Sequence, residues 1–152
     1  MIEICEGDLF RAPIGIICHQ VNCQGVMGCG IAKTFKEKYP YTFELYASFC
    51  REYDPIELLG KVMLLAEQDG KYSCCMFAQN DWRGHGCNTN YVAFRECCKA
   101  IKQKIERRQL GNIIINMPYR IGAGLGGGDW EIIYSILEEE FDGYNVVLWK
   151  LN

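Results

Sequence analysis

The chain has 152 residues, and 49% of them are hydrophobic, which predicts one domain over residues 1–152 whose core needs no metal or disulfide. The formal net charge of -3 opposes broad affinity for a polyanion. No apolar run approaches the roughly 18 to 20 residues of a membrane-spanning helix, and no leader-like segment follows Met1. We therefore expect a soluble, monomeric, cytoplasmic protein with no membrane partner.

Ten cysteines raise the question of a zinc site or a disulfide framework. The adjacent pairs Cys74/Cys75 and Cys97/Cys98 are not CxxC hooks, and no HxxxH motif accompanies them. Four cysteines lie in apolar, strand-like runs, where a reduced thiol behaves as a small hydrophobic side chain: Cys5, Cys18, Cys74 and Cys75. We expect free thiols, no metal site and no cofactor.

The first elements along the chain are two strands and a pair of short helices. Residues 2–5 and the apolar run 14–21 predict strands, the second of them buried on both faces. After the glycine-rich segment 25–30, residues 31–38 predict a helix that Pro40 interrupts. Apolar periodicity resumes beyond the proline, which predicts a second helix.

The middle of the chain predicts a hairpin followed by a long helix. Residues 60–66 and 72–77 are rich in β-formers, and Asp69-Gly70 between them is a turn signal, so the two strands should be antiparallel. Apolar residues at spacings of three and four predict one helix over 89–108, capped by Asn88 or Thr89.

The last third repeats the order of strand, glycines and helix. Residues 113–117 predict a strand, and five of the seven residues 122–128 are glycine. Residues 130–141 predict a helix that Asp129 would cap, and residues 144–151 predict a final strand. This alternation is typical of an α/β fold, here a three-layer α/β/α sandwich with a central mixed sheet.

Both glycine-rich segments join the end of a strand to the start of a helix. In open α/β sheets, ligands bind beyond the carboxyl ends of the strands, where helix N-termini present unpaired N–H groups to anions. Neither segment matches a P-loop or a dinucleotide fingerprint. Tight turns that need positive φ would explain either segment alone, but two at equivalent junctions favour a phosphate site.

Polar residues beside the first glycine segment add a second signal. His19 and Asn22 end a strand that is otherwise apolar, and an amide suits a ribose hydroxyl or a positioned water. Two alternatives stay open: Asn22 could cap the loop backbone, and His19 could be a satisfied core histidine. Asp8 after Gly7 is either a turn residue or an acceptor for an adenine amino group.

The chain resembles the macrodomain family over nearly its whole length. The resemblance lies in three segments: Gly7-Asp8-Leu9, His19-Gln-Val-Asn22-Cys-Gln-Gly25-Val-Met-Gly28-Cys-Gly30-Ile-Ala-Lys33, and Met117-Pro118-Tyr-Arg-Ile-Gly122-Ala-Gly124-Leu-Gly-Gly-Gly128-Asp-Trp130. Within the family, the chain is most similar to the branch of ADP-ribose 1″-phosphate phosphatases and of phage-type and bacterial single-domain members. The resemblance implies that the protein binds ADP-ribose or a derivative of it.

Carried over residue by residue, the resemblance implies a complete ligand site. Asp8 would bond the adenine amino group, Leu9 would line the adenine pocket, and Asn22 would hold the distal ribose. Phe77 and Asn80 would line the ribose end. The diphosphate would lie between two groups of residues: Gly28, Cys29, Gly30 and Ile31 on one side, and Gly122, Ala123, Gly124, Leu125, Gly126 and Gly127 on the other.

The catalytic groups of the family are only partly present. Members that release ADP-ribose from carboxylates use a lysine after the fourth strand, where residues 77–83 here contain none. A hydrolase would instead use His19 as acid/base or electrostatic partner, Asn22 to position water, and Asp129 as a weaker candidate base. His85, in the 80–88 loop, could close over the ribose or be an ordinary polar loop residue.

Two functions therefore remain open at this stage. The protein hydrolyses an ADP-ribose derivative, either the 1″-phosphate or an ADP-ribosylated protein or nucleic acid, or it recognises ADP-ribose without turnover. Extended binding of RNA or poly(ADP-ribose) is disfavoured by the acidic charge balance, and a nicotinamide-dependent oxidoreductase is disfavoured by the glycine spacing.

Overall fold

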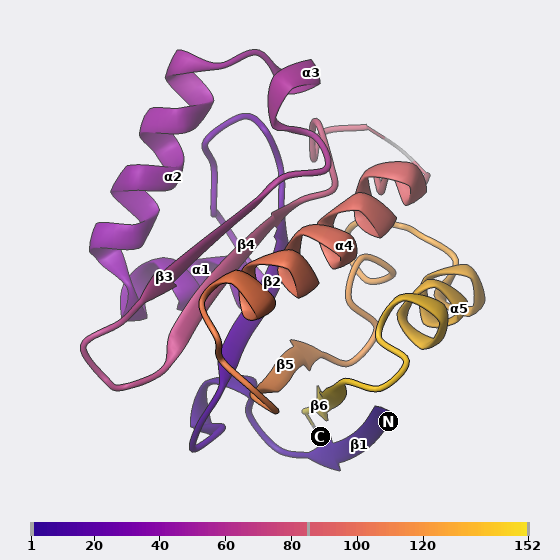
Figure 1. Ribbon diagram of the computed structural model, residues 1–152. Helices are drawn as coiled ribbons and strands as arrows, with labels where there is room; N and C mark the ends of the chain where they lie inside the picture. The colour runs from indigo at the N-terminus through magenta and orange to yellow at the C-terminus, as the bar shows by residue number, and fades with distance from the viewer. Residues whose placement is uncertain (1, 85, 152) are drawn as a thin grey trace.

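The computed structural model describes residues 2–84 and 86–151, which build a six-stranded sheet flanked by helices (Figure 1). The strands are β1 (Ile2–Glu6), β2 (Ile16–Val21), β3 (Val62–Ala66), β4 (Tyr72–Phe77), β5 (Ile114–Pro118) and β6 (Asn145–Lys150). The helices are the 3₁₀ turn η1 (Leu9–Arg11), α1 (Gly30–Lys38), α2 (Pro40–Glu52), α3 (Pro55–Leu58), α4 (Tyr91–Arg107) and α5 (Trp130–Glu140).

The sheet is mixed, as the sequence predicts. Its order is β1-β6-β5-β2-β4-β3, and every neighbouring pair is parallel except β3 and β4. The predicted hairpin turn joins β3 and β4, with Gly70 at a φ of 86° that favours glycine. Because β2, β4 and β5 are parallel neighbours, their carboxyl ends meet at one edge of the sheet.

Alternation along β2 divides the core into two halves, one on each face of the sheet. Ile17 and Val21 pack with Phe35 of α1 and Tyr46 of α2. Cys18, on the opposite face, packs with side chains of α4 and α5. Figure 1 shows these helix pairs flanking the sheet, so the predicted three-layer α/β/α sandwich is confirmed.

Two of the predicted helix starts agree with the structure, and the predicted cap of α4 does not. Pro40 is the first residue of α2, and the Asp129 side chain accepts a hydrogen bond from the Glu131 amide at the start of α5, as predicted. The cap of α4 is Asn90, whose side chain accepts from the Ala93 amide, so the prediction of Asn88 or Thr89 is wrong. The side chains of Asn88 and Thr89 instead bond to carbonyls of neighbouring loops.

The ten cysteines are free thiols, and six of them are buried. Burial raises the pKa of Cys23 to about 12, so this thiol stays protonated at neutral pH. Within residues 2–84 and 86–151, no three His, Cys, Asp or Glu side chains gather as a metal site would require. No helix in the same residues is long and apolar enough to cross a membrane.

Candidate functional site

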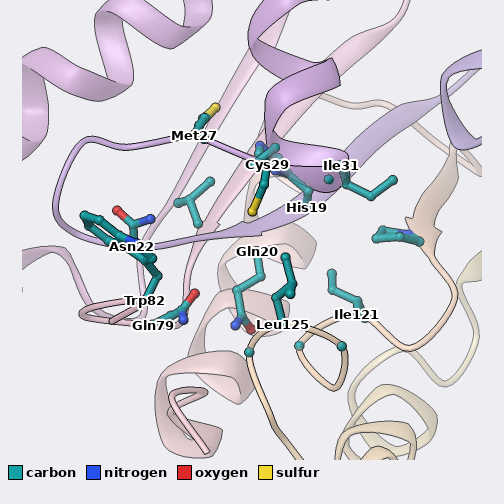
Figure 2. A pocket seen from close by; sticks show the side chains of 18 of the residues that line it. His19, Gln20, Asn22, Met27, Cys29, Ile31, Gln79, Trp82, Ile121 and Leu125 are labelled. Atoms are coloured by element: carbon teal, nitrogen blue, oxygen red, sulfur yellow. The ribbon is translucent and has the colours of Figure 1, made fainter. Parts of the chain in front are cut away.

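The two glycine segments flank one cavity at the carboxyl ends of β2, β4 and β5. Its volume is about 470 Å³, within the usual range for a small-molecule site (Figure 2). The first wall is residues 26–32, and the opposite wall is residues 118–122 and 124–126. The β2 residues His19 and Gln20 form the floor, and Asn22, Gln79 and Trp82 lie together at one end.

The first wall ends in the N-terminus of α1. Gly30 begins the helix at a φ of 60°, and Cys29 precedes it without a side-chain hydrogen bond to the first turn. The opening amides of an α-helix have no partner within the helix and carry a partial positive charge. This wall therefore presents N–H groups toward the cavity, as a phosphate site requires.

In the loop of the second wall, residues 120–127, four carbonyl oxygens accept hydrogen bonds within the protein. Arg120 O accepts from the Ala123 amide at 2.9 Å, and Gly124 O accepts from the Gly127 amide at 3.1 Å. Gly122 O accepts from the Gly128 amide and the Thr89 hydroxyl, and Gly126 O accepts from the amides of Asn88 and Thr89 and from the Thr89 hydroxyl. Because these four carbonyl oxygens already accept hydrogen bonds from the protein, they repel an anion in the cavity less than unpaired carbonyls would.

The amides of the same loop are largely unpaired. Within the part of the chain that the structure describes, five of its N–H groups have no acceptor: those of Arg120, Gly122, Gly124, Leu125 and Gly126. All five residues line the cavity. Paired acceptors and unpaired donors in one loop make a binding surface for an anion.

Glycine is also a steric requirement in this loop. A Cβ on Gly128 would lie 2.7 Å from Gly122 O, and a Cβ on Gly127 would collide with the Gly86 carbonyl. Gly122 and Gly127 have φ values of 76° and 69°. The tight-turn explanation is therefore correct for the shape of the loop, and the shape is what exposes the amides.

Asn22 supports the first wall from within. Its Oδ1 accepts from the Gln24 amide at 2.9 Å and from the Tyr46 hydroxyl at 2.8 Å, and its Nδ2 donates to Val26 O at 2.8 Å. The alternative that Asn22 caps the loop backbone is thus confirmed. It also lines the cavity, and the second hydrogen on Nδ2 has no acceptor among the described residues.

His19 lies under the first turns of α1 and is only 2% exposed. Its ring stacks on Phe35 with 3.9 Å between centroids. Burial lowers the pKa of His19 to about 3, so the ring is neutral at pH 7. The structure therefore does not support a His19 that gives and takes a proton near neutral pH, although the ring lines the cavity. Its Nδ1 is buried with no partner in the described chain.

Asp129 does not lie with His19 and Asn22. It lines a separate surface groove between α4 and α5, where its amide donates to the Tyr91 hydroxyl at 2.8 Å. Its carboxylate is engaged in capping α5. The candidate general base is therefore a helix cap outside the cavity.

The remaining predicted ligand residues divide into lining and supporting positions. Gly28, Cys29, Gly30, Ile31, Gly122, Gly124, Leu125 and Gly126 line the cavity, whereas Ala123 and Gly127 lie outside its lining. Asp8 caps η1 by accepting from the Phe10 amide, and Leu9 and Phe77 are 2% exposed core residues. Asn80 O accepts from the Cys23 amide at 3.0 Å and so braces the first loop. His85 lies outside the described residues.

Comparison with known proteins identifies the family to which this fold belongs. The profile of the Macro domain family matches residues 18–137. The chain belongs to the Macro domain family. The resemblance inferred from the glycine segments is thereby confirmed.

The macrodomain is similar over most of its length to named relatives. It is 30% identical to the ADP-ribose 1″-phosphate phosphatase of Debaryomyces hansenii, covering 91% of this chain and 93% of that protein. It is also 30% identical to the enzyme of the same name from Scheffersomyces stipitis, covering 96% and 98%. The macrodomain of Mycobacterium tuberculosis DarG superposes with a TM-score of 0.80 at 30% identity, covering 98% and 97% of the chains.

The macrodomain cavity contains residues that the sequence did not single out. Gln79 and Trp82 follow the end of β4, and Tyr119 and Arg120 follow β5. Like Asn22, these four residues lie just beyond the carboxyl end of a central strand. That position is the sequence signal that could have identified them as site residues. Arg120 is the one lining residue with a charged side chain in the described chain, and the lining includes no Lys, Asp or Glu.

Proposed function

We propose that this macrodomain binds ADP-ribose, or a derivative of it, and hydrolyses the derivative at the distal ribose. The observation that carries the proposal is the loop at residues 120–127, in which five amides have no acceptor among the described residues while four carbonyls are hydrogen-bonded within the protein. Opposite this loop lies the N-terminus of α1. Two converging sets of donors suit a diphosphate, which carries charge on both of its phosphorus centres.

The two ends of the cavity suit the two ends of such a ligand. Asn22, Gln79 and Trp82 supply amides and an aromatic ring at one end, where the distal ribose would lie. Tyr119 and Arg120 lie toward the other, where Asp8 and Leu9 would meet adenine. The names of the two relatives specify an ADP-ribose derivative, which supports a ligand of this kind.

Hydrolysis of a 1″-phosphate would proceed by attack of water on phosphorus. The bond between phosphorus and the ribose oxygen breaks, the ribose oxygen takes up a proton, and the products are ADP-ribose and inorganic phosphate. In this site the free Nδ2 hydrogen of Asn22 would hold the ribose or the water, and the neutral ring of His19 would act through its dipole. Catalysis would rest on positioning and backbone amides.

A non-catalytic recognition module is the second candidate. It is favoured by the lining itself, which in the described chain has no carboxylate or lysine and has a histidine that is neutral at pH 7. In this case the protein would bind ADP-ribose, the product of the reaction for which the relatives are named, without catalysing that reaction.

Release of phosphate from ADP-ribose 1″-phosphate, followed beside calorimetric titration of ADP-ribose, distinguishes these candidates. Binding with multiple turnovers supports the hydrolase, and binding with no phosphate release supports the recognition module. No saturable binding of ADP-ribose at millimolar concentration would exclude both.

A further inference from the structure

Thr89 lies behind the second wall of the cavity and touches both ends of its glycine loop. Its hydroxyl donates to Gly122 O at 2.7 Å, and its backbone amide donates to Gly126 O at 3.2 Å. The side chain is 6% exposed and does not line the cavity. One residue from the segment before α4 thus holds two carbonyls of a loop that follows β5.

The Thr89 hydroxyl is in turn held by β2. Gln20 Nε2 donates to Thr89 Oγ1 at 2.9 Å, which fixes the hydroxyl proton on the opposite side, toward Gly122 O. Gln20 is itself a floor residue of the cavity. The chain of hydrogen bonds therefore links the floor, Thr89 and the glycine loop through the half-buried side chain of Gln20 and the buried side chain of Thr89.

The direction of these bonds decides which way the loop peptides face. Gly122 O and Gly126 O accept from Thr89, which lies outside the cavity lining, whereas the unpaired amides belong to residues that line the cavity. With positive φ at Gly122 and Gly127, the glycines allow the peptide planes to rotate at little steric cost. Thr89 supplies two donors from outside the loop, its hydroxyl and its amide, and these add to the bonds that the loop makes within itself from the Ala123 and Gly127 amides.

The same segment ties the loop to the ribose end of the cavity. The Asn88 amide donates to Gly126 O at 2.8 Å, and its Nδ2 donates to Gly84 O at 3.0 Å and to Trp82 O at 3.4 Å. Asn88, the residue next to Thr89, therefore joins the glycine loop to the segment that carries Trp82.

We propose that Thr89 is the positioning residue that holds the glycine loop in its anion-binding conformation, with Gln20 fixing the direction of its hydroxyl. The inference rests on the proposed function, because it takes the loop as the diphosphate site. Thr89 acts through the loop and does not touch the ligand.

The test is Thr89→Val, which keeps the shape of the side chain and removes the hydroxyl, with Thr89→Ser to restore it. Thr42→Val is the matched control, since Thr42 is 1% exposed and its hydroxyl donates to Glu67 at 2.5 Å on the other side of the sheet. Affinity for ADP-ribose is measured by calorimetry and unfolding temperature by a thermal scan, for all four proteins.

We expect Thr89→Val to weaken ADP-ribose binding about tenfold, Thr89→Ser to recover most of the loss, and Thr42→Val to lower the unfolding temperature without changing affinity. Equal affinity in Thr89→Val and wild type would overturn the inference. So would a loss of affinity in Thr42→Val that matches its loss of stability, because binding would then follow general stability. If wild type binds no ADP-ribose, the proposed function fails instead. Should Thr89→Val not fold, the same comparison is made with Gln20→Met, for which we expect a smaller loss in the same direction.

Discussion

The Nε2 atom of His19 lies 3.6 Å from the Sγ atom of Cys75, and both side chains are buried between the sheet and α1. Burial raises the pKa of the Cys75 thiol well above its usual value, so the thiol is a neutral partner for the ring. Burial removes the ring of His19 from water, which disfavours its protonated form and lowers its pKa. The first prediction follows from this shift.

Lowering the pH should destabilise the protein through His19. The pKa of this group is about 3 in the folded protein against 6.5 for an ordinary histidine, so the unfolded chain binds more protons between these values. Stability therefore falls as pH drops through this window, by about 2 kcal/mol between pH 7 and pH 5 from this group alone. Urea unfolding of wild type and His19→Gln at both pH values measures it. A variant that loses as much stability as wild type would show that His19 is not the source.

Replacing Asn22 with Ala should loosen the first wall of the cavity. The change removes bonds to the Gln24 amide, the Tyr46 hydroxyl and Val26 O, and we expect a loss of about 1 to 3 kcal/mol in stability together with weaker ADP-ribose binding. Thermal unfolding and calorimetry report the two effects. Normal stability combined with weak binding would instead mean that Asn22 serves the ligand alone.

Gly127→Ala should be far more damaging than Gly70→Ala. Both positions have positive φ, which costs an alanine about 1 to 2 kcal/mol, but only the Cβ at residue 127 collides with the Gly86 carbonyl. Chemical denaturation should show the larger loss at Gly127, and ADP-ribose affinity should fall there only. Similar losses at the two sites would argue against the close packing of the two loops.

Asp129 gives a test that separates capping from catalysis. Asp129→Asn keeps a good capping side chain, whereas Asp129→Ala removes it and should cost about 1 kcal/mol of stability. Neither variant should change ADP-ribose affinity or turnover of the 1″-phosphate. A fall in turnover in the stable Asp129→Asn protein would restore Asp129 as a catalytic base.

Local patterns in the sequence are sufficient to predict the three layers of the fold and the two glycine segments that form the walls of the cavity. The strand and helix periods, the Asp69-Gly70 turn and the two glycine segments each depend on a few consecutive residues, and the structure has them where they were expected. Contacts between distant segments were not accessible in this way. The sequence predicts Asn88 or Thr89 as a helix cap, because the bond from Thr89 to Gly122 O, 33 residues away, leaves no local pattern in the sequence.

The roles of individual site residues depended on burial, which the sequence does not report. His19 has the right chemistry for proton transfer, but its 2% exposure removes the charge that the chemistry needs. Asp129 is adjacent in sequence to the second glycine segment, yet the turn at Gly127 and Gly128 carries it out of the cavity. Gln79 and Trp82 were missed because only two of the three adjoining parallel strands end in glycines.

The central claim, that the paired glycine loops hold a diphosphate attached to two riboses, is tested most directly by calorimetric titration. ADP-ribose is titrated into the wild-type protein beside ADP and AMP. The account predicts one-to-one saturable binding in the order ADP-ribose, ADP, AMP, since each step removes contacts with the ribose end or with one phosphate. Equal affinity for ADP-ribose and AMP, or no binding of ADP-ribose at millimolar concentration, would contradict it.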